Sequence, residues 1–141
     1  MPTALSKEEA YEFLDSHPGW LIFSTVGKNG YPHSVPVSYF RLGDEIYVNA
    51  RFRTQRAKNA ERNHRVSALV ETGRTMQDIK GLMIQGEAEM ISQPEEVLPL
   101  MREAARTRGI PEERLPTEPM PDMAFIRIKP RRFISWGLSP G

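Results

Sequence analysis

Apolar residues in this chain mostly alternate with polar ones, the period that predicts half-buried β-strands. The alternating segments are rich in aromatic and β-branched residues, and short turns containing Gly, Asn or Asp separate them. This pattern predicts strands over residues 20–26, 31–41, 45–50, 65–71, 81–92 and 123–128, with 131–137 as a candidate seventh.

Three segments have the spacing of helices instead. Ser6 and Glu9 form a capping box, in which a serine at the helix start is followed three residues later by a glutamate. Thr54 is a candidate N-cap for a second, short helix. The predicted helices cover residues 7–16, 54–63 and 94–108.

Strands joined mainly by turns, with few helices, indicate a mainly β protein: an antiparallel barrel of six to seven strands with peripheral helices. The length of 141 residues predicts a single domain over residues 1–141. Pro36 interrupts the second strand, and because proline has no N–H to donate, it indicates an edge, a bulge or an open ladder. Residues 109–122 contain four prolines and predict a stiff loop that is able to cover a site.

Composition narrows the classes of function. The net charge of +1 argues against a general polyanion binder, so no nucleic-acid partner is expected. The absence of cysteine excludes disulfides and thiolate chemistry, and it fits a cytoplasmic location. The three histidines lack metal-ligand spacing, and no apolar run approaches the roughly 20 residues needed to span a membrane. We therefore expect no metal site and no membrane segment.

Positive charge is concentrated in residues 51–65, which contain six lysine and arginine residues and one acidic residue, Glu61. Backbone N–H groups at a helix start and nearby cationic side chains both favour an anion. Arg56 offers a bidentate fork and Lys58 a point charge, and Thr54 lies on the same helix face as Lys58. The stretch therefore predicts a phosphate site, with a solvated surface helix and a nucleic-acid contact as the alternatives.

Four segments, in this order, resemble the pyridoxamine 5'-phosphate oxidase-like superfamily of flavin-binding split β-barrels. They are an opening hairpin with Pro-His and Val-Pro-Val, a basic loop with its helix and strand, a Gly-x-Ala strand, and a closing strand pair. They cover residues 21–37, 54–70, 82–90 and 125–137. The resemblance is more specific for the fold than for the substrate, because one fold hosts many activities.

The resemblance implies a homodimer with two equivalent flavin sites at the interface between the subunits. It places the second strand along the isoalloxazine ring, where the candidate contacts are Ser34, Val35, Pro36 and Val37. It places the ribityl phosphate at the end of the third strand and the next helix, with the candidates Asn49, Ala50, Arg51, Thr54, Gln55, Arg56 and Lys58. Trp136 is a candidate to reach the other subunit's site.

The implied function is that of a flavin-dependent oxidoreductase, which transfers hydride between bound FMN and a small-molecule substrate. The cofactor does the chemistry, and no side chain is predicted to be catalytic. A deazaflavin coenzyme is the alternative cofactor, since residues 135–141 resemble the Gly-Leu-Pro-Pro-Gly ending of some deazaflavin-using members, with Ser139 replacing the first proline. A non-catalytic module that binds a flavin or haem is the alternative from another class.

Overall fold

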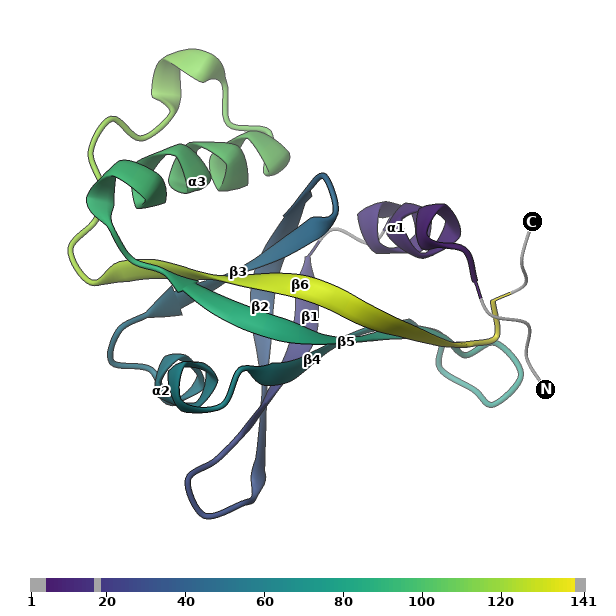
Figure 1. The fold of residues 1–141 in the computed structure, drawn as a ribbon. Helices are drawn as coiled ribbons and strands as arrows, with labels where there is room; N and C mark the ends of the chain where they lie inside the picture. Colours follow the sequence, from purple (N-terminus) through teal and green to yellow (C-terminus); the bar gives the residue numbers. More distant parts are fainter. Residues whose placement is uncertain (1–4, 17–18, 139–141) are drawn as a thin grey trace.

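Six antiparallel strands form a closed barrel with three helices around it in the computed structural model, which describes residues 5–16 and 19–138 (Figure 1). The strands are β1 (Trp20–Val26), β2 (Pro32–Leu42), β3 (Glu45–Arg51), β4 (Arg65–Thr72), β5 (Lys80–Ile91) and β6 (Met123–Trp136). Their order around the sheet is β1-β2-β3-β6-β5-β4, and pairing of β1 with β4 closes it. The predicted mainly β barrel is confirmed.

The prediction of a seventh strand is wrong, because residues 123–136 form one continuous strand, β6. Pro130 does not end this strand. The register of β5 against β6 shifts next to Gly86, which lies opposite Pro130. A Cβ on Gly86 would lie 2.5 Å from the carbonyl oxygen of Lys129, so the bulge requires glycine.

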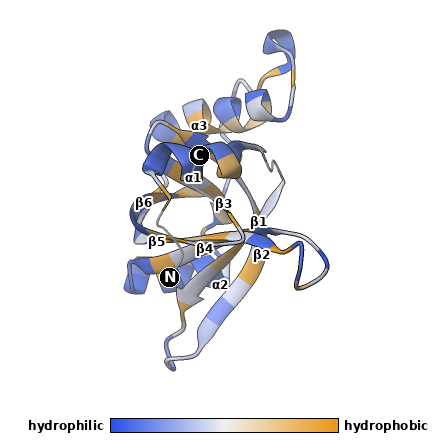
Figure 2. Cartoon of the chain, turned by 90° about the vertical axis from the view of Figure 1, so that its right-hand side faces the viewer, coloured by the Kyte–Doolittle hydropathy of each residue, from blue (hydrophilic) through white to orange (hydrophobic). Residues whose placement is uncertain are grey.

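The helices cover different sides of the barrel (Figure 1). In front of α1 (Lys7–Ser16) the capping box is present: Glu9 N–H donates to Ser6 Oγ at 3.1 Å, and Ser6 N–H donates to Glu9 Oε1 at 3.0 Å. α2 (Gln55–Arg62) packs on β1 and β5, and α3 (Pro94–Thr107) packs on β2 and β6. Hydrophilic and hydrophobic residues alternate along α3 (Figure 2), as in a helix that packs by one face. No helix in the described ranges is long and apolar enough to cross a membrane.

Two apolar clusters hold these elements together. The first fills the barrel and includes Leu21, Phe23 and Ile84. The second lies between α3 and the outer face of the sheet, and its members are Phe40, Tyr47, Ile91, Val97, Leu100, Met101 and Phe125. Within it the ring of Phe40 stacks on Tyr47 with 5.2 Å between centroids and meets Phe125 edge-on at 5.8 Å. This second cluster fixes α3 outside the barrel.

Although the barrel is closed, the ladder between β2 and β3 covers only one end of these two strands, which leaves an opening in the barrel wall at the other end. From Pro32 to Ser38, β2 pairs with β1, but among the described strands it pairs with β3 only from Tyr39 to Leu42. Beyond Val48, β3 continues to Arg51 against β6 alone. The two strand edges therefore diverge, and the backbone groups that face each other across the opening have no ladder partner. Pro36, as predicted, lies in a stretch of strand with one open edge.

Candidate functional site

The predicted phosphate site lies where β3 ends and α2 begins. Thr54 is the N-cap of α2, as predicted, because its Oγ1 accepts a hydrogen bond from Ala57 N–H at 3.3 Å. The same hydroxyl donates to the carbonyl oxygen of Arg51 at 2.8 Å. Thr54 therefore caps the first turn of α2. Its hydroxyl proton is donated to the carbonyl oxygen of Arg51, so it is not available to a phosphate.

Arg56 lies between α2 and the open edge of β3. Its Nε donates a hydrogen bond to the carbonyl oxygen of Asn49 at 3.0 Å, and no hydrogen bond joins its terminal nitrogens to another described residue. Partial burial lowers the pKa of the Arg56 guanidinium from its ordinary value, although arginine remains charged in proteins. The bond to Asn49 fixes the guanidinium at the opening and leaves its outer fork for an anion.

The other phosphate candidates divide into two groups. Arg51 and Lys58 are exposed on either side of the α2 start, and neither forms a salt bridge with a described residue. Ala50 is fully buried in the barrel core, so only its backbone is able to face a ligand. Gln55 is turned along the helix, where its Nε2 donates to Asn59 Oδ1 at 2.7 Å. The structure therefore holds Arg56 at the opening, leaves Arg51 and Lys58 exposed near the start of α2, and removes the Ala50 side chain from the site.

The candidates on β2 alternate between the two faces of the strand. Val37 is buried and Val35 packs against the barrel core, so neither side chain faces outward. Ser34 and Pro36 are exposed on the outer face, and Ser34 Oγ shares a hydrogen bond of 2.8 Å with Ser24 Oγ. A ligand outside the barrel is therefore able to meet the Ser34 and Pro36 side chains, but only the backbone of the two valines.

Trp136 lies apart from these residues within one chain. β6 begins beside the phosphate candidates, where Met123 pairs with Arg51, and its 14 residues end at Trp136. At about 3.3 Å per residue, this strand spans on the order of 45 Å. Trp136 is 46% exposed and packs beside Gly81. The end of β6 lies on the side of the barrel away from α2 (Figure 1). Within one chain, Trp136 is therefore not part of this site.

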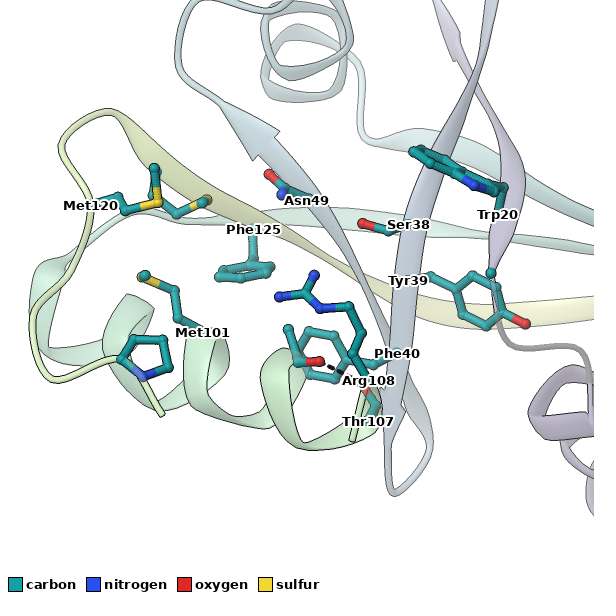
Figure 3. Close-up of a pocket in the computed structure, with 14 residues that line it drawn as sticks. Trp20, Ser38, Tyr39, Phe40, Asn49, Met101, Thr107, Arg108, Met120 and Phe125 are labelled. Carbon is teal, nitrogen blue, oxygen red and sulfur yellow. Dashed lines mark hydrogen bonds between the residues drawn. The ribbon is translucent and has the colours of Figure 1, made fainter. Parts of the chain in front are cut away.

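A cavity that the sequence did not reveal lies next to the opening. It has a volume of about 470 Å³ and lies between α3, the proline-rich loop and the outer face of the sheet (Figure 3). One wall comes from the end of α3, with Met101, Ala104, Thr107 and Arg108. The loop, which contains the 3-10 turn Glu112–Arg114, adds Pro116 and Met120. The prediction that this loop covers a site fits its position.

Asn49 connects the cavity with the phosphate candidates. Its side chain lines the cavity together with Ser38 from β2, at the point where β2 and β3 diverge. The backbone carbonyl oxygen of the same residue accepts the hydrogen bond from Arg56 Nε. The cavity and the cationic start of α2 are therefore two parts of one region, joined by the opening of the barrel.

The comparison with known proteins shows the family of this chain. Residues 6–137 match the family described as pyridoxamine 5'-phosphate oxidase. The chain belongs to this family. The resemblance carried by the four sequence segments is thereby confirmed. No curated protein matches the chain in sequence.

Several solved structures share the fold of this family member. A conserved hypothetical protein of Mycobacterium tuberculosis, Rv2991, is 26% identical, with a TM-score of 0.78 over 94% of this chain and 84% of its own. An F420 reductase is 19% identical, with a TM-score of 0.68 over 95% and 98%. HutZ, the haem storage protein of Vibrio cholerae, is 18% identical, with a TM-score of 0.69 over 97% and 98%.

The family relationship does not by itself fix the activity of this chain, because similar structures include both a reductase and a haem storage protein. Within residues 5–16 and 19–138, no group of three His, Cys, Asp or Glu residues is arranged to hold a metal ion. The features of this chain that bear on its function are therefore its cations and its open backbone edges.

Proposed function

We propose that this chain is a flavin-dependent oxidoreductase that transfers hydride between bound FMN and a small-molecule substrate, with the deazaflavin coenzyme F420 as the alternative cofactor. Membership of the pyridoxamine 5'-phosphate oxidase family supports this function. The observation that carries it is the cationic start of α2, where Arg56 is anchored on the open edge of β3.

Three cations would hold the cofactor phosphate. Arg56 would use its outer fork, and Arg51 and Lys58 would add charge from the exposed sides of the site. The first backbone N–H groups of α2, at Gln55 and Arg56, have no partner within the helix and favour an anion. Glu61, the one acidic residue of the stretch, lies in the last turn of α2. The donor set therefore fits a phosphate.

The open edge of β2 would hold the polar edge of the flavin ring. Backbone N–H and C=O groups between Ser34 and Ser38 that point away from β1 have no partner strand in the described part of the chain, so they would be able to bond such an edge. A bound flavin supplies hydride transfer at its ring. The protein would orient the ring, exclude water and hold the phosphate, with no side chain required as an acid or base.

A row of outward-facing apolar residues supports a homodimer. Pro36, Ile22, Leu69, Met83 and Ile134 lie directly opposite one another on β2, β1, β4, β5 and β6. The residues beside them along these strands pack into the barrel core, so this apolar row faces outward. A continuous apolar patch of this kind marks an interaction site. In a two-fold symmetric dimer, the same row of a second copy would pack against this row and cover it.

The homodimer would also complete the cofactor site. Pro36 belongs both to the apolar row and to the open edge proposed for the flavin ring. A cofactor on this edge would lie at the margin of the interface. Trp136 follows the row's last member, Ile134, by two positions on β6. In a dimer it would therefore be available to the partner's cofactor.

Titration of the purified chain with FMN and, in parallel, with F420 tests the proposed function. Flavin fluorescence should report micromolar or tighter binding of one cofactor in preference to the other. The loaded protein should then oxidise NADPH or NADH, or accept hydride from a substrate. Failure of both cofactors to bind would overturn the proposal. Binding without any reduction by a hydride donor would instead indicate a non-catalytic flavin module.

A further inference from the structure

We propose that the cavity under α3 binds a small organic acid, a molecule with an apolar body and one anionic group, and that Arg108 selects it by charge. As a substrate pocket, this inference rests on the proposed function. As a binding site, it rests only on the cavity itself.

The size and lining of the cavity fit an apolar body. Its volume of about 470 Å³ lies within the roughly 300–1,000 Å³ of small-molecule sites. Phe40 and Phe125 form its floor on the sheet, and Met101 faces them from α3. Trp20 and Met120, which are 69% and 44% exposed, mark where the cavity meets solvent. A ring-sized apolar group would therefore find aromatic and thioether partners on several sides.

Arg108 supplies the only charge that lines this cavity among the described residues. Its backbone N–H caps the end of α3 through the carbonyl oxygens of Ala105 and Arg106. In Figure 3 its guanidinium points into the cavity, toward Phe125 and Asn49. Among the described residues, no acidic side chain lines the cavity and no carboxylate forms a salt bridge with Arg108. The neighbouring Arg106, by contrast, is bound to Glu103 and Glu112.

Polar groups on the opposite wall complete the recognition. Ser38 and Asn49 line the cavity from β2 and β3, across from Arg108 (Figure 3). A carboxylate or sulfonate held by the guanidinium would thus have hydroxyl and amide donors within the same cavity. Both residues lie where the barrel opens, so the acid would approach the proposed flavin edge.

Two dyes that differ in one anionic group test this inference without any cofactor. They are 1-anilinonaphthalene-8-sulfonate, which is anionic, and N-phenyl-1-naphthylamine, which has the same rings and no charge. Both gain fluorescence in apolar surroundings, and we expect both to bind the purified chain. Arg108→Gln should weaken binding of the anionic dye about tenfold or more, the loss expected for one charge-assisted hydrogen bond. It should change binding of the neutral dye by less than about twofold.

Two further variants locate the dyes. Arg114→Gln, an exposed arginine in the 3-10 turn that does not line the cavity, should leave both affinities unchanged. Ala104→Phe should fill the cavity and weaken both dyes; if it does not fold, Thr107→Trp on the same wall replaces it. An equal response of the anionic dye to Arg108→Gln and Arg114→Gln would overturn the charge role. Unchanged affinities in the filled variant, or no dye binding at all, would overturn the site.

The dye experiments test the acid-binding cavity independently of the proposed oxidoreductase function. If the dyes respond as expected and neither FMN nor F420 binds, the oxidoreductase proposal fails and the acid-binding cavity stands. If a cofactor binds and the dyes do not distinguish Arg108→Gln from the wild type, the acid-binding inference fails alone.

Discussion

The Nε of Arg56 donates a hydrogen bond of 3.0 Å to the carbonyl oxygen of Asn49, and this bond joins α2 to the open edge of β3. A lysine at position 56 would keep the charge but lacks the planar fork that bonds the carbonyl and an anion together. We expect Arg56→Lys to weaken FMN binding about tenfold, by the loss of about 1.5 kcal/mol. Isothermal titration calorimetry measures this loss. An affinity equal to that of the wild type would show that charge alone is sufficient.

A buried polar network supports the same helix. Asn59 is fully buried, donates to Thr25 Oγ1 at 3.0 Å and accepts from Gln55 Nε2 at 2.7 Å. Asn59→Leu would leave the buried Thr25 hydroxyl without a partner, so we expect it to lower the free energy of unfolding by about 2–3 kcal/mol. Urea unfolding measures this change. The double variant with Thr25→Val should recover part of the loss, and a strictly additive double variant would contradict the network.

The stability of the fold should depend on pH through Tyr39, whose hydroxyl donates to the carbonyl oxygen of Leu14 at 2.7 Å. Burial, helped by the charge of Asp15, raises the pKa of Tyr39 from 10.0 to about 12. The folded state therefore keeps a phenol proton that the unfolded chain releases more easily. Its stabilising contribution is complete below pH 10 and is lost as the pH rises to about 12.

The matching experiment compares the wild type with Tyr39→Phe. The free energy of unfolding of the wild type should fall by up to about 2–3 kcal/mol more than that of the variant between pH 10 and pH 12. Chemical denaturation at several pH values in this range gives both curves. Parallel curves would mean that the phenol of Tyr39 titrates normally in the folded protein.

The apolar row predicts a dimer that a single charge disrupts. Leu69→Lys places an ammonium at the middle of the row, where a second copy would desolvate it. We expect this variant to sediment as a folded monomer and to bind FMN more weakly than the dimeric wild type. Gln85→Lys is the matched control, because Gln85 is exposed on the outer face of β5, two positions beyond Met83. A monomeric wild type would contradict the homodimer.

Local signals in the sequence predicted the parts of the fold that depend on near neighbours. The Ser6–Glu9 capping box and the Thr54 N-cap are both present, because each needs only the first turn of its own helix. The strand break at Pro130 was predicted wrongly, since a bulge opposite Gly86 on β5 accommodates the proline. That compensation depends on pairing between distant segments and has no signature near Pro130.

For the candidate site, the sequence predicted the cationic residues but not the cavity. The cations Arg56 and Lys58 stood out by charge and spacing. The structure holds Arg56 at the opening through Asn49 and leaves Lys58 exposed on α2. The cavity did not stand out, because it exists only where α3 docks on Phe40 and Phe125. Arg108 lies outside the basic stretch, and only the docking of α3 turns it toward the cavity.

The affinity ratio of FMN to riboflavin, which lacks the phosphate, tests the central claim most directly. The wild type should prefer FMN by about a hundredfold or more, as two charged hydrogen bonds imply. The variant with Arg56→Ala and Lys58→Ala should bind both ligands about equally, while Arg65→Ala, an exposed arginine of the same stretch, keeps the preference. A double variant that folds and retains the full preference for FMN would contradict the phosphate site at the start of α2.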